Sequence, residues 1–458
     1  MTIKIKTLSI IVCLLFFMSC KKFVEVPPLS IQVQGDQVFS GDATATSAIV
    51  GMYSEMMKAS GFFSSSSTTL LCGLYADELQ TYTSNSYDDF MNSNLTEVDH
   101  GVISTNFWTP AYRIIYTANL CLEKLQSSST LSPVVKSSLI GESEFVRAFC
   151  FFTLVNLCGD VPLTVSSDYR INAVMPRTAT SAVWDQVIAD LLDAKSRLSS
   201  SYMGADRARP NKWAAAALLA RAYLYTGQWA KAEAEATEII NAGVYTLNAN
   251  LNNVFIKSSG ETIWQLAPVN TLWNTWEGKE ILPATSSTAP TYLIHPNLLN
   301  AFETSDQRKS SWIASRTYLG QTVSYPYKYK VYGNNAPVTE YYVVLRLAEQ
   351  FLIRAEARAK QNSTAGAQAD LNNIRNRAGL SNTIANDPAS LAAAIEQERR
   401  VELFAEWGHR WFDLKRTNRA DAVIGTTKPG NWQPAHVLWP IPINQILANP
   451  ALTQNPGY

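Results

Sequence analysis

Residues 210–243 read PNKWAAAALLARAYLYTGQWAKAEAEATEIINAG. Small and large apolar residues recur there at helical spacing on both sides of a central glycine. The positions that carry the pattern are Leu219, Ala220, Tyr223, Gly227, Trp229 and Ala232. The two alanines allow close approach of two helices, the Tyr and Trp side chains fill the space between them, and the glycine permits the turn. We therefore expect an antiparallel pair of helices here.

These offsets are those of a tetratricopeptide helix-turn-helix. A second pair is indicated over 345–378, where Ala348, Ala355, Ala359 and Ala367 line one face. Such helices cannot bury their apolar faces alone and have to stack on neighbouring pairs. The expected fold class is therefore mainly α, a tetratricopeptide-like α-α superhelical scaffold with an irregular, loop-rich variable subdomain.

Helical spacing is also found over 36–59, 108–126, 134–157 and 178–198. A segment at 387–408 begins with Asp-Pro and ends in Gly, as helix capping predicts. A Ser/Thr-rich stretch interrupts the helical pattern at 60–69, and the polar stretch 79–106 has no steady period, which favours an exposed loop.

Residues 245–342 differ from both flanks because turn residues and aromatic residues lie close together there. Long irregular segments inside a compact domain are usually functional. We therefore divide the chain into an N-terminal helical scaffold at 35–244, a variable subdomain and candidate ligand region at 245–342, and a C-terminal scaffold with its tail at 343–458.

The first residues have the pattern of a secretory leader. Lys4 and Lys6 precede an apolar run at 8–17, and Ser19 precedes Cys20. A cysteine directly after the cleavage point fits a lipoprotein signal at 1–19, with lipidation at Cys20 and a lipid-anchored tether at 20–34. Ordinary cleavage near Ser19, with an incidental cysteine, is the alternative. No later apolar run is long enough to cross a membrane.

Charge and cysteine content exclude several classes. Lys+Arg and Asp+Glu each total 38, so no basic excess exists to attract nucleic acid. Cys150 and Cys158 lie in an apolar helical segment and are expected to be buried thiols. The chain has no Cys/His cluster at zinc spacing and no phosphate-binding glycine loop, so we expect no metal and no cofactor.

Aromatic residues with polar neighbours are the candidate ligand contacts, because sugar rings stack on Trp and Tyr while their hydroxyls need amide or carboxyl partners. The candidates in the variable subdomain are Trp273, Asn274, Trp276 and Tyr292, and those that form an opposing rim are Tyr82, Tyr87 and Asp88. The alternative for each aromatic residue is packing beneath its own loop. A local basic patch is also expected in the subdomain, from Arg308, Lys309, Arg316, Lys328 and Lys330.

A cluster of acids at 398–413 invites an enzymatic interpretation, since paired carboxylates carry out glycoside hydrolysis. Glu398 and Glu402 share a helical face and Asp413 follows. Every acid there has an Arg or Lys close by in sequence, and ion-paired carboxylates are poor general acids. We therefore expect no catalytic residues and no enzyme.

Motifs along nearly the whole chain resemble the SusD/RagB family of outer-membrane nutrient-binding lipoproteins. They are CKKFVEVPP at 20–28, GESEFVRA at 141–148, GDVPL at 159–163, the helix pair at 214–229, segments 345–357 and 371–379, ERRVELFAEWGHRWFDLKR at 398–416, WPIPI at 439–443 and QNPGY at 454–458. The resemblance implies four tetratricopeptide-like helix pairs that support a variable subdomain.

The resemblance also implies a role. The expected function is to bind an oligosaccharide, or sometimes a peptide, at the cell surface and to deliver it to a SusC-like TonB-dependent transporter in the outer membrane. Lys21 and Lys22 stand where acidic residues often accompany surface export. Two other classes remain open: a secreted tetratricopeptide scaffold that binds only protein, and a lipoprotein glycoside hydrolase.

Overall fold

A computed structural model describes residues 35–96, 98, 101–269, 272–333 and 336–458. The leader at 1–19, the tether at 20–34 and the lipidation site Cys20 lie outside the described residues. The expectations for them stay predictions.

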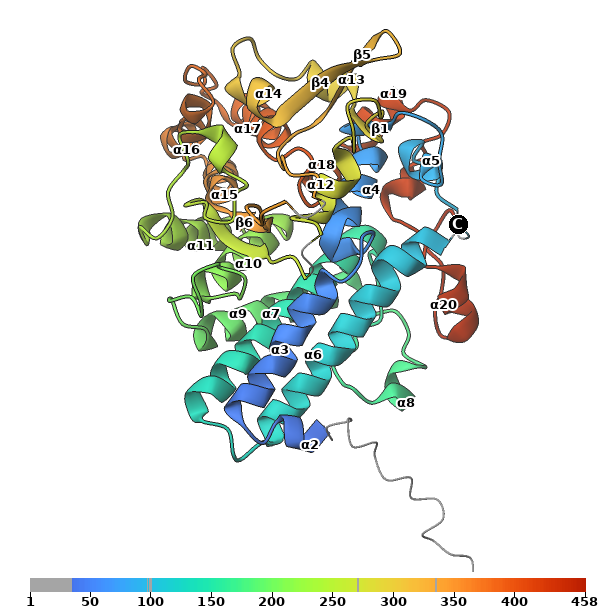
Figure 1. Ribbon diagram of the computed structural model, residues 1–458, viewed down its shortest axis with the longest axis vertical. Helices are drawn as coiled ribbons and strands as arrows, with labels where there is room; N and C mark the ends of the chain where they lie inside the picture. Colours follow the sequence, from blue (N-terminus) through green and yellow to red (C-terminus); the bar gives the residue numbers. More distant parts are fainter. Residues whose placement is uncertain (1–34, 97, 99–100, 270–271, 334–335) are drawn as a thin grey trace, which may run out of the picture.

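Stacked helices form the body of the molecule (Figure 1). They are α2 (Gly35–Val38), α3 (Asp42–Met56), α6 (Thr109–Ser127), α7 (Pro133–Cys158), α8 (Tyr169–Asn172), α9 (Thr180–Arg197), α10 (Lys212–Tyr225), α11 (Trp229–Asn241), α15 (Leu347–Lys360), α16 (Thr364–Arg377) and α17 (Pro388–Glu402). Helices α6, α7, α9, α10, α11, α15 and α16 each pack on the next in that order, and α3 packs on α6 and α7. The mainly α superhelical scaffold is confirmed.

The helix pair predicted from 210–243 is present as α10 and α11. Helix α10 begins at Asn211, whose Oδ1 accepts hydrogen bonds from the backbone N–H groups of Trp213 (3.1 Å) and Ala214 (3.0 Å). The turn passes through Gly227 at φ +71°. A Cβ at this glycine would lie 3.6 Å from the Trp229 ring, so the turn and the ring pack in van der Waals contact. Local pattern alone sufficed for this pair.

The Ser/Thr-rich stretch is a buried helix rather than a break in the structure. Its elements are the π-helix η2 (Phe63–Ser67) and helix α4 (Thr68–Tyr75), followed by β1 (Leu79–Thr81), α5 (Asp88–Met91) and the π-helix η4 (Ile103–Trp108). Ser64 to Ser67 are at most 3% exposed. Their hydroxyls reach nearby carbonyls; Ser64 Oγ, for example, donates to Met56 O at 2.8 Å. The exposed loop expected over 79–106 is wrong in part, because Phe90 and Leu95 are buried there.

The variable subdomain consists of short elements, as expected. They are η5 (Leu251–Asn253), β2 (Thr262–Leu266), α12 (Trp276–Ile281), β3 (Tyr292–Ile294), α13 (Pro296–Leu299), α14 (Gln307–Trp312), β4 (Ile313–Tyr318) and β5 (Gln321–Pro326), with β6 (Tyr342–Arg346) at its border. All pairs are antiparallel: β1 with β3, β2 with β6, and β4 with β5. Figure 1 places β4 and β5 at the top of the molecule, opposite α2.

The last elements are α18 (His409–Arg416), α19 (Ala420–Thr427), η6 (Pro434–Val437) and α20 (Ile443–Ala448). Gly408 begins α18 rather than ending α17, which stops at Glu402. Trp439, after η6, is fully buried. Its ring lies edge-on to Tyr75 (5.4 Å between ring centroids), Phe90 (5.1 Å) and Phe107 (5.2 Å). The tail therefore completes a core that N-terminal segments begin.

Arg308 and Lys328 do not belong to a surface patch. Both are buried. Arg308 Nη1 lies 2.6 Å from Glu398 Oε1 and 3.0 Å from Glu402 Oε2, and Lys328 Nζ bonds Glu406. The basic patch predicted for the variable subdomain is therefore wrong: two of its members neutralise acids of α17 and the turn that follows it.

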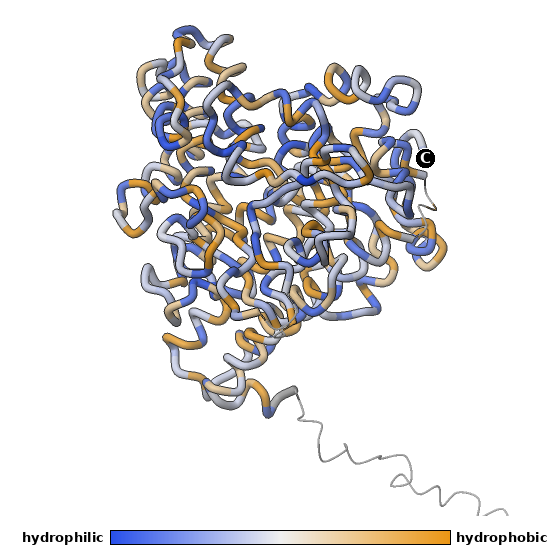
Figure 2. The backbone as a smooth tube through the Cα atoms, turned by 45° about the horizontal axis from the view of Figure 1, so that its top comes forward, coloured by the Kyte–Doolittle hydropathy of each residue, from blue (hydrophilic) through white to orange (hydrophobic). Residues whose placement is uncertain are grey.

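Hydrophobic and hydrophilic residues are interspersed along the chain (Figure 2). Among the described residues, no helix has the length and apolarity needed to cross a membrane. The side chains of Cys72, Cys121, Cys150 and Cys158 are buried, so the expectation of buried thiols at Cys150 and Cys158 is confirmed. Within the same residues, no group of three or more His, Cys, Asp or Glu side chains could hold a metal ion.

Candidate functional site

The short β1–β3 ribbon brings the two groups of predicted aromatic residues together. Thr81 of β1 faces Tyr292 of β3, and the next residue, Tyr82, donates its N–H to Thr291 O at 3.0 Å. The Tyr82 ring lies 5.4 Å from that of Tyr318. Segments more than 200 residues apart in sequence thus lie side by side; that they form two rims of a ligand site stays a prediction.

A cavity of about 260 Å³ lies close to this ribbon. It is lined by Ser60, Gly61, Ser66, Ser67, Leu70, Leu71, Tyr87, Asn106, Glu280 and Tyr292. We call it the tyrosine pocket. Two predicted residues, Tyr87 and Tyr292, line it from opposite parts of the chain. Ser66 and Ser67 come from the buried π-helix η2, so the irregular helix supplies part of one wall.

The ionisable groups of the tyrosine pocket act on one another. Burial raises the pKa of Tyr87, and the Glu280 carboxyl raises it further. Burial likewise raises the pKa of Tyr292, with smaller contributions from Tyr87 and Glu280. Both phenols therefore keep their protons at neutral pH and can donate hydrogen bonds. Glu280 Oε1 accepts from Lys279 Nζ at 2.8 Å, and Glu280 is the only residue with a carboxyl side chain in the lining of the pocket.

Asn106 is held in place by two neighbours. Its Nδ2 donates to Ser67 Oγ at 3.1 Å, and its Oδ1 accepts from Thr105 Oγ1 at 2.9 Å. Asn106 and Glu280 were not among the predicted ligand contacts. The spacing of Glu280 one helical turn after Trp276 was a signal for one of them. Nothing local indicated Asn106, which reaches the pocket only through the packing of η4 against η2.

Trp273 and Trp276 form a half-buried aromatic ridge at the start of α12. Their ring centroids are 6.4 Å apart. Trp276 Nε1 donates to Met57 O at 2.8 Å, which fixes α12 against the end of α3. The Trp273 ring meets Tyr332 edge-on at 5.7 Å. Because Trp276 and Glu280 share one face of α12, the ridge continues toward the tyrosine pocket.

The expectation of direct ligand contact by Asn274 needs correction. Its side chain is fully buried. Its Oδ1 accepts from the N–H groups of Thr339 (2.7 Å) and Glu340 (2.9 Å), and its Nδ2 donates to Pro337 O at 3.2 Å. Asn274 therefore fixes the backbone beneath the ridge, because both ends of its buried amide bond to backbone groups of 337–340.

The carboxyl group of Asp88 closes a local turn. Its Oδ1 accepts from the Asn85 N–H at 3.1 Å, and its Oδ2 accepts from the Ser84 hydroxyl. This turn places Tyr87, the neighbouring residue, in the pocket. Asp88 thus positions a pocket residue and is absent from the pocket lining.

The acids that invited an enzymatic interpretation are all ion-paired. Glu398 bonds Arg308, and Arg399 Nε lies 2.7 Å from Asp413 Oδ2. Arg399 and Arg416 keep the pKa of Asp413 low although its burial would raise it. A pair of carboxylates free to exchange protons with a sugar is not formed by these residues.

Two family models match separate parts of the chain. One, described as "SusD family", matches residues 271–458, and the other, described as "Starch-binding associating with outer membrane", matches residues 22–224. "SusD-like protein P25" of Formosa agariphila is 25% identical over 99% of this chain and 100% of its own length.

Solved structures share the fold. A SusD superfamily protein from Bacteroides vulgatus superposes with a TM-score of 0.82 at 19% identity, covering 92% of this chain and 100% of the other. A structure titled "Laminarin binding SusD-like protein" superposes with a TM-score of 0.75 at 24% identity, covering 91% and 99%. Because these superpositions cover more than nine tenths of this chain, its helical scaffold and its variable subdomain belong to the same overall fold as those structures.

Proposed function

Because the chain belongs to the SusD/RagB family, we propose that it is a nutrient-binding lipoprotein of the outer membrane that captures an oligosaccharide. Support comes from one matching family, described as starch-binding, and from a solved relative described as laminarin-binding. Attachment through a lipid on Cys20, on the cell exterior, and delivery of the ligand to a SusC-like TonB-dependent transporter complete the proposal.

The convergence of Tyr87, Tyr292, Glu280 and Asn106 carries the proposal for the site. Two protonated phenols, one carboxylate and one amide offer both donors and acceptors to sugar hydroxyls. The cavity of about 260 Å³ is of the size of a single sugar residue, and the Trp273–Trp276 ridge offers aromatic faces for the next one. Tyr82, paired with Tyr318, extends the rim on the other side.

We assign this protein binding rather than catalysis. Glycoside hydrolysis needs one carboxylic acid with a raised pKa near a second free carboxylate. The lining of the tyrosine pocket contains one carboxyl group, that of Glu280. Glu398 and Asp413 form ion pairs with arginines. No specific contact favours the protein-only scaffold.

Calorimetric titration tests the proposal. The chain from Lys21 onward would be titrated with β-glucan, α-glucan and other neutral oligosaccharides, and with peptides as the competing ligand class. For a glycan that binds, Glu280→Gln is expected to weaken affinity about tenfold or more, since a hydrogen bond to a charged group contributes about 1.5–3 kcal/mol. Tyr87→Phe, which removes one hydroxyl, is expected to weaken it several-fold.

Tyr169→Phe is the matched control, because this tyrosine is 74% exposed on α8, outside the pocket. Binding that the control leaves unchanged and both pocket variants weaken would support the site. Glycan binding that neither pocket variant changes would refute the site while leaving the function in place. Binding of peptides alone would refute the oligosaccharide assignment.

A further inference from the structure

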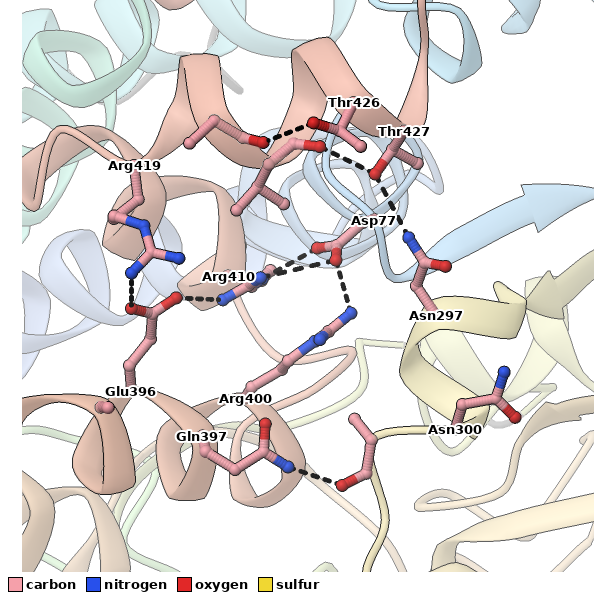
Figure 3. A pocket seen from close by; sticks show the side chains of 14 residues that line it. Asp77, Asn297, Asn300, Glu396, Gln397, Arg400, Arg410, Arg419, Thr426 and Thr427 are labelled. Carbon is pink, nitrogen blue, oxygen red and sulfur yellow. Dashed lines mark hydrogen bonds and ion pairs between the residues drawn. The ribbon is translucent and has the colours of Figure 1, made fainter. Parts of the chain in front are cut away.

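A second cavity of about 560 Å³ lies between α13, α17 and α19 (Figure 3). Its charged lining consists of Asp77, Glu396, Arg400, Arg410 and Arg419. We call it the arginine cavity. Asp77 precedes β1 and the nearby His295 follows β3, so the cavity lies at the opposite end of the β1–β3 ribbon from Tyr82 and Tyr292. It shares no lining residue with the tyrosine pocket.

The cavity has more positive than negative groups. Arg410 bridges the two acids: its Nε lies 2.8 Å from Asp77 Oδ1 and its Nη1 lies 3.2 Å from Glu396 Oε1. Arg400 also bonds Asp77, at 2.5 Å, and Arg419 bonds Glu396, at 3.1 Å. Three guanidinium groups thus share two carboxylates, which leaves one positive charge uncompensated within the cluster.

One arginine offers unused donors to the cavity. Nε of Arg400 also has no hydrogen-bond partner among the described residues, but this atom is buried and out of reach of a ligand. Arg419 uses only Nη1 in its ion pair, and its side chain is 50% exposed, which leaves the edge formed by Nε and Nη2 open. Such an edge presents two parallel N–H groups that match the two oxygens of a carboxylate. Burial lowers the pKa of Arg400, so an anion beside it would stabilise its charged form.

Uncharged polar groups line the remaining wall. Gln397 Nε2 donates to Ala301 O at 2.5 Å, so its Oε1 is left to accept a hydrogen bond from a ligand. The amide of Asn300 is exposed. The hydroxyls of Thr426 and Thr427 donate to helix carbonyls. Thr427 Oγ1 also accepts from Asn297 Nδ2 at 3.2 Å, whereas Thr426 Oγ1 keeps its acceptor lone pairs. Figure 3 shows the threonines and Asn300 on the side of the cavity away from Arg419. Groups of this kind pair with hydroxyls.

We propose that the arginine cavity binds a polyhydroxylated molecule of monosaccharide size that carries one carboxylate. Arg419 holds the carboxylate, Arg400 adds its positive charge beside it, and the amides and threonine hydroxyls of the facing wall bind the hydroxyl groups. The volume lies in the range of small-ligand sites. The cavity is a site separate from the tyrosine pocket, and its occupancy does not depend on the glycan proposed there.

Calorimetric titration of the chain from Lys21 onward with D-glucuronate, D-glucose and inorganic phosphate tests this proposal. Glucuronate is expected to bind more tightly than either of the other two. Arg419→Gln is expected to weaken glucuronate binding at least tenfold, and Arg419→Lys to weaken it less, because lysine keeps the charge but loses the fork. Arg170→Gln is the control: its side chain is 75% exposed, it is paired with Asp168, and it loses the same charge far from the cavity.

Several results would overturn the inference. Equal affinity for glucose and glucuronate would mean that the carboxylate is not recognised, and equal affinity for phosphate and glucuronate would reduce the cavity to a simple anion site. Equal weakening by Arg170→Gln and Arg419→Gln would assign the effect to net charge. Absence of glucuronate binding to the wild-type chain would refute the site outright. Thermal melts of both variants establish that the fold is intact in each comparison.

Discussion

Replacing Glu402 by glutamine would remove one negative charge from the centre of a buried ion cluster. Glu402 is fully buried and accepts hydrogen bonds from Arg308 Nη1 (3.0 Å), Arg346 Nη1 (2.6 Å) and Arg377. Burial alone would raise the pKa of Glu402, but the three arginines together hold it well below its usual range. Glu402 is therefore ionised in the folded state at neutral pH.

The expected loss in the free energy of unfolding depends on which carboxylate partners the arginines keep after the substitution. Removing one partner of a buried ion pair costs about 3–5 kcal/mol, since the remaining charge is left in a poorly solvated place. Glutamine has the size of glutamate and still accepts a hydrogen bond. Arg308 keeps Asp306 and Glu398, and Arg346 keeps Glu261. We therefore expect the lower end of the range, a loss of about 3 kcal/mol in the free energy of unfolding.

Urea unfolding at pH 7, followed by tryptophan fluorescence and circular dichroism, measures this loss. Glu55→Gln is the control, because Glu55 pairs with Lys58 and Arg113 on the surface and is expected to contribute less than about 1 kcal/mol. The stability from Glu402 is present above its unfolded-state pKa of 4.5 and is lost as the pH falls. The difference between variant and wild type should therefore narrow in acid. A loss below about 1 kcal/mol at pH 7 would refute the reasoning.

Two further changes test other features of the fold. Burial raises the pKa of Glu277 to about 8, so the stability that this carboxyl contributes is present below pH 4.5 and lost as the pH rises through 8. Glutamine at this position can still accept the hydrogen bond from the Tyr342 hydroxyl. In wild type the free energy of unfolding should fall by up to about 1.4 kcal/mol per pH unit between pH 5 and 8, and Glu277→Gln should remove this fall. Plots of the free energy of unfolding against pH that run parallel for variant and wild type would contradict this. Gly408→Ala would place a Cβ 2.9 Å from Cys72 Cβ at φ +71°, whereas Gly101→Ala, at φ +74°, meets nothing within 4 Å. Both should lose about 1–2 kcal/mol from backbone strain, and Gly408→Ala measurably more; equal losses in thermal or urea unfolding would contradict a close contact.

The scaffold was predictable because its signals are local. The pattern around Gly227 specifies α10 and α11 through residues that lie within one or two helical turns of one another. The Asp387 cap specified the start of α17 in the same way. The end of that helix was predicted wrongly. Gly408, which looked like its C-terminal cap, has a φ of +71° and lies directly before α18 instead.

What sequence reasoning missed depends on partners far along the chain. Arg308 and Lys328 looked like surface cations, but acids 78 to 94 residues away, together with Asp306 beside Arg308, neutralise them inside the fold. The aromatic signal did single out Tyr87 and Tyr292, whereas Asn106 and Glu280 became visible only once the β1–β3 ribbon and the η2 wall were in place. A polar residue has no periodic signature that marks it as facing a cavity.

Trp439 has a consequence for the order of events during synthesis. Its ring completes the packing of Tyr75, Phe90 and Phe107, and the ribosome makes it some 330 residues or more after them. The packing around Tyr75, Phe90 and Phe107 therefore stays incomplete until the segment with Trp439 has been made. A chain that breaks off before this tryptophan would expose these incompletely packed rings to chaperones and proteases. The stability of the first helices thereby depends on a segment that lies hundreds of residues further along the chain.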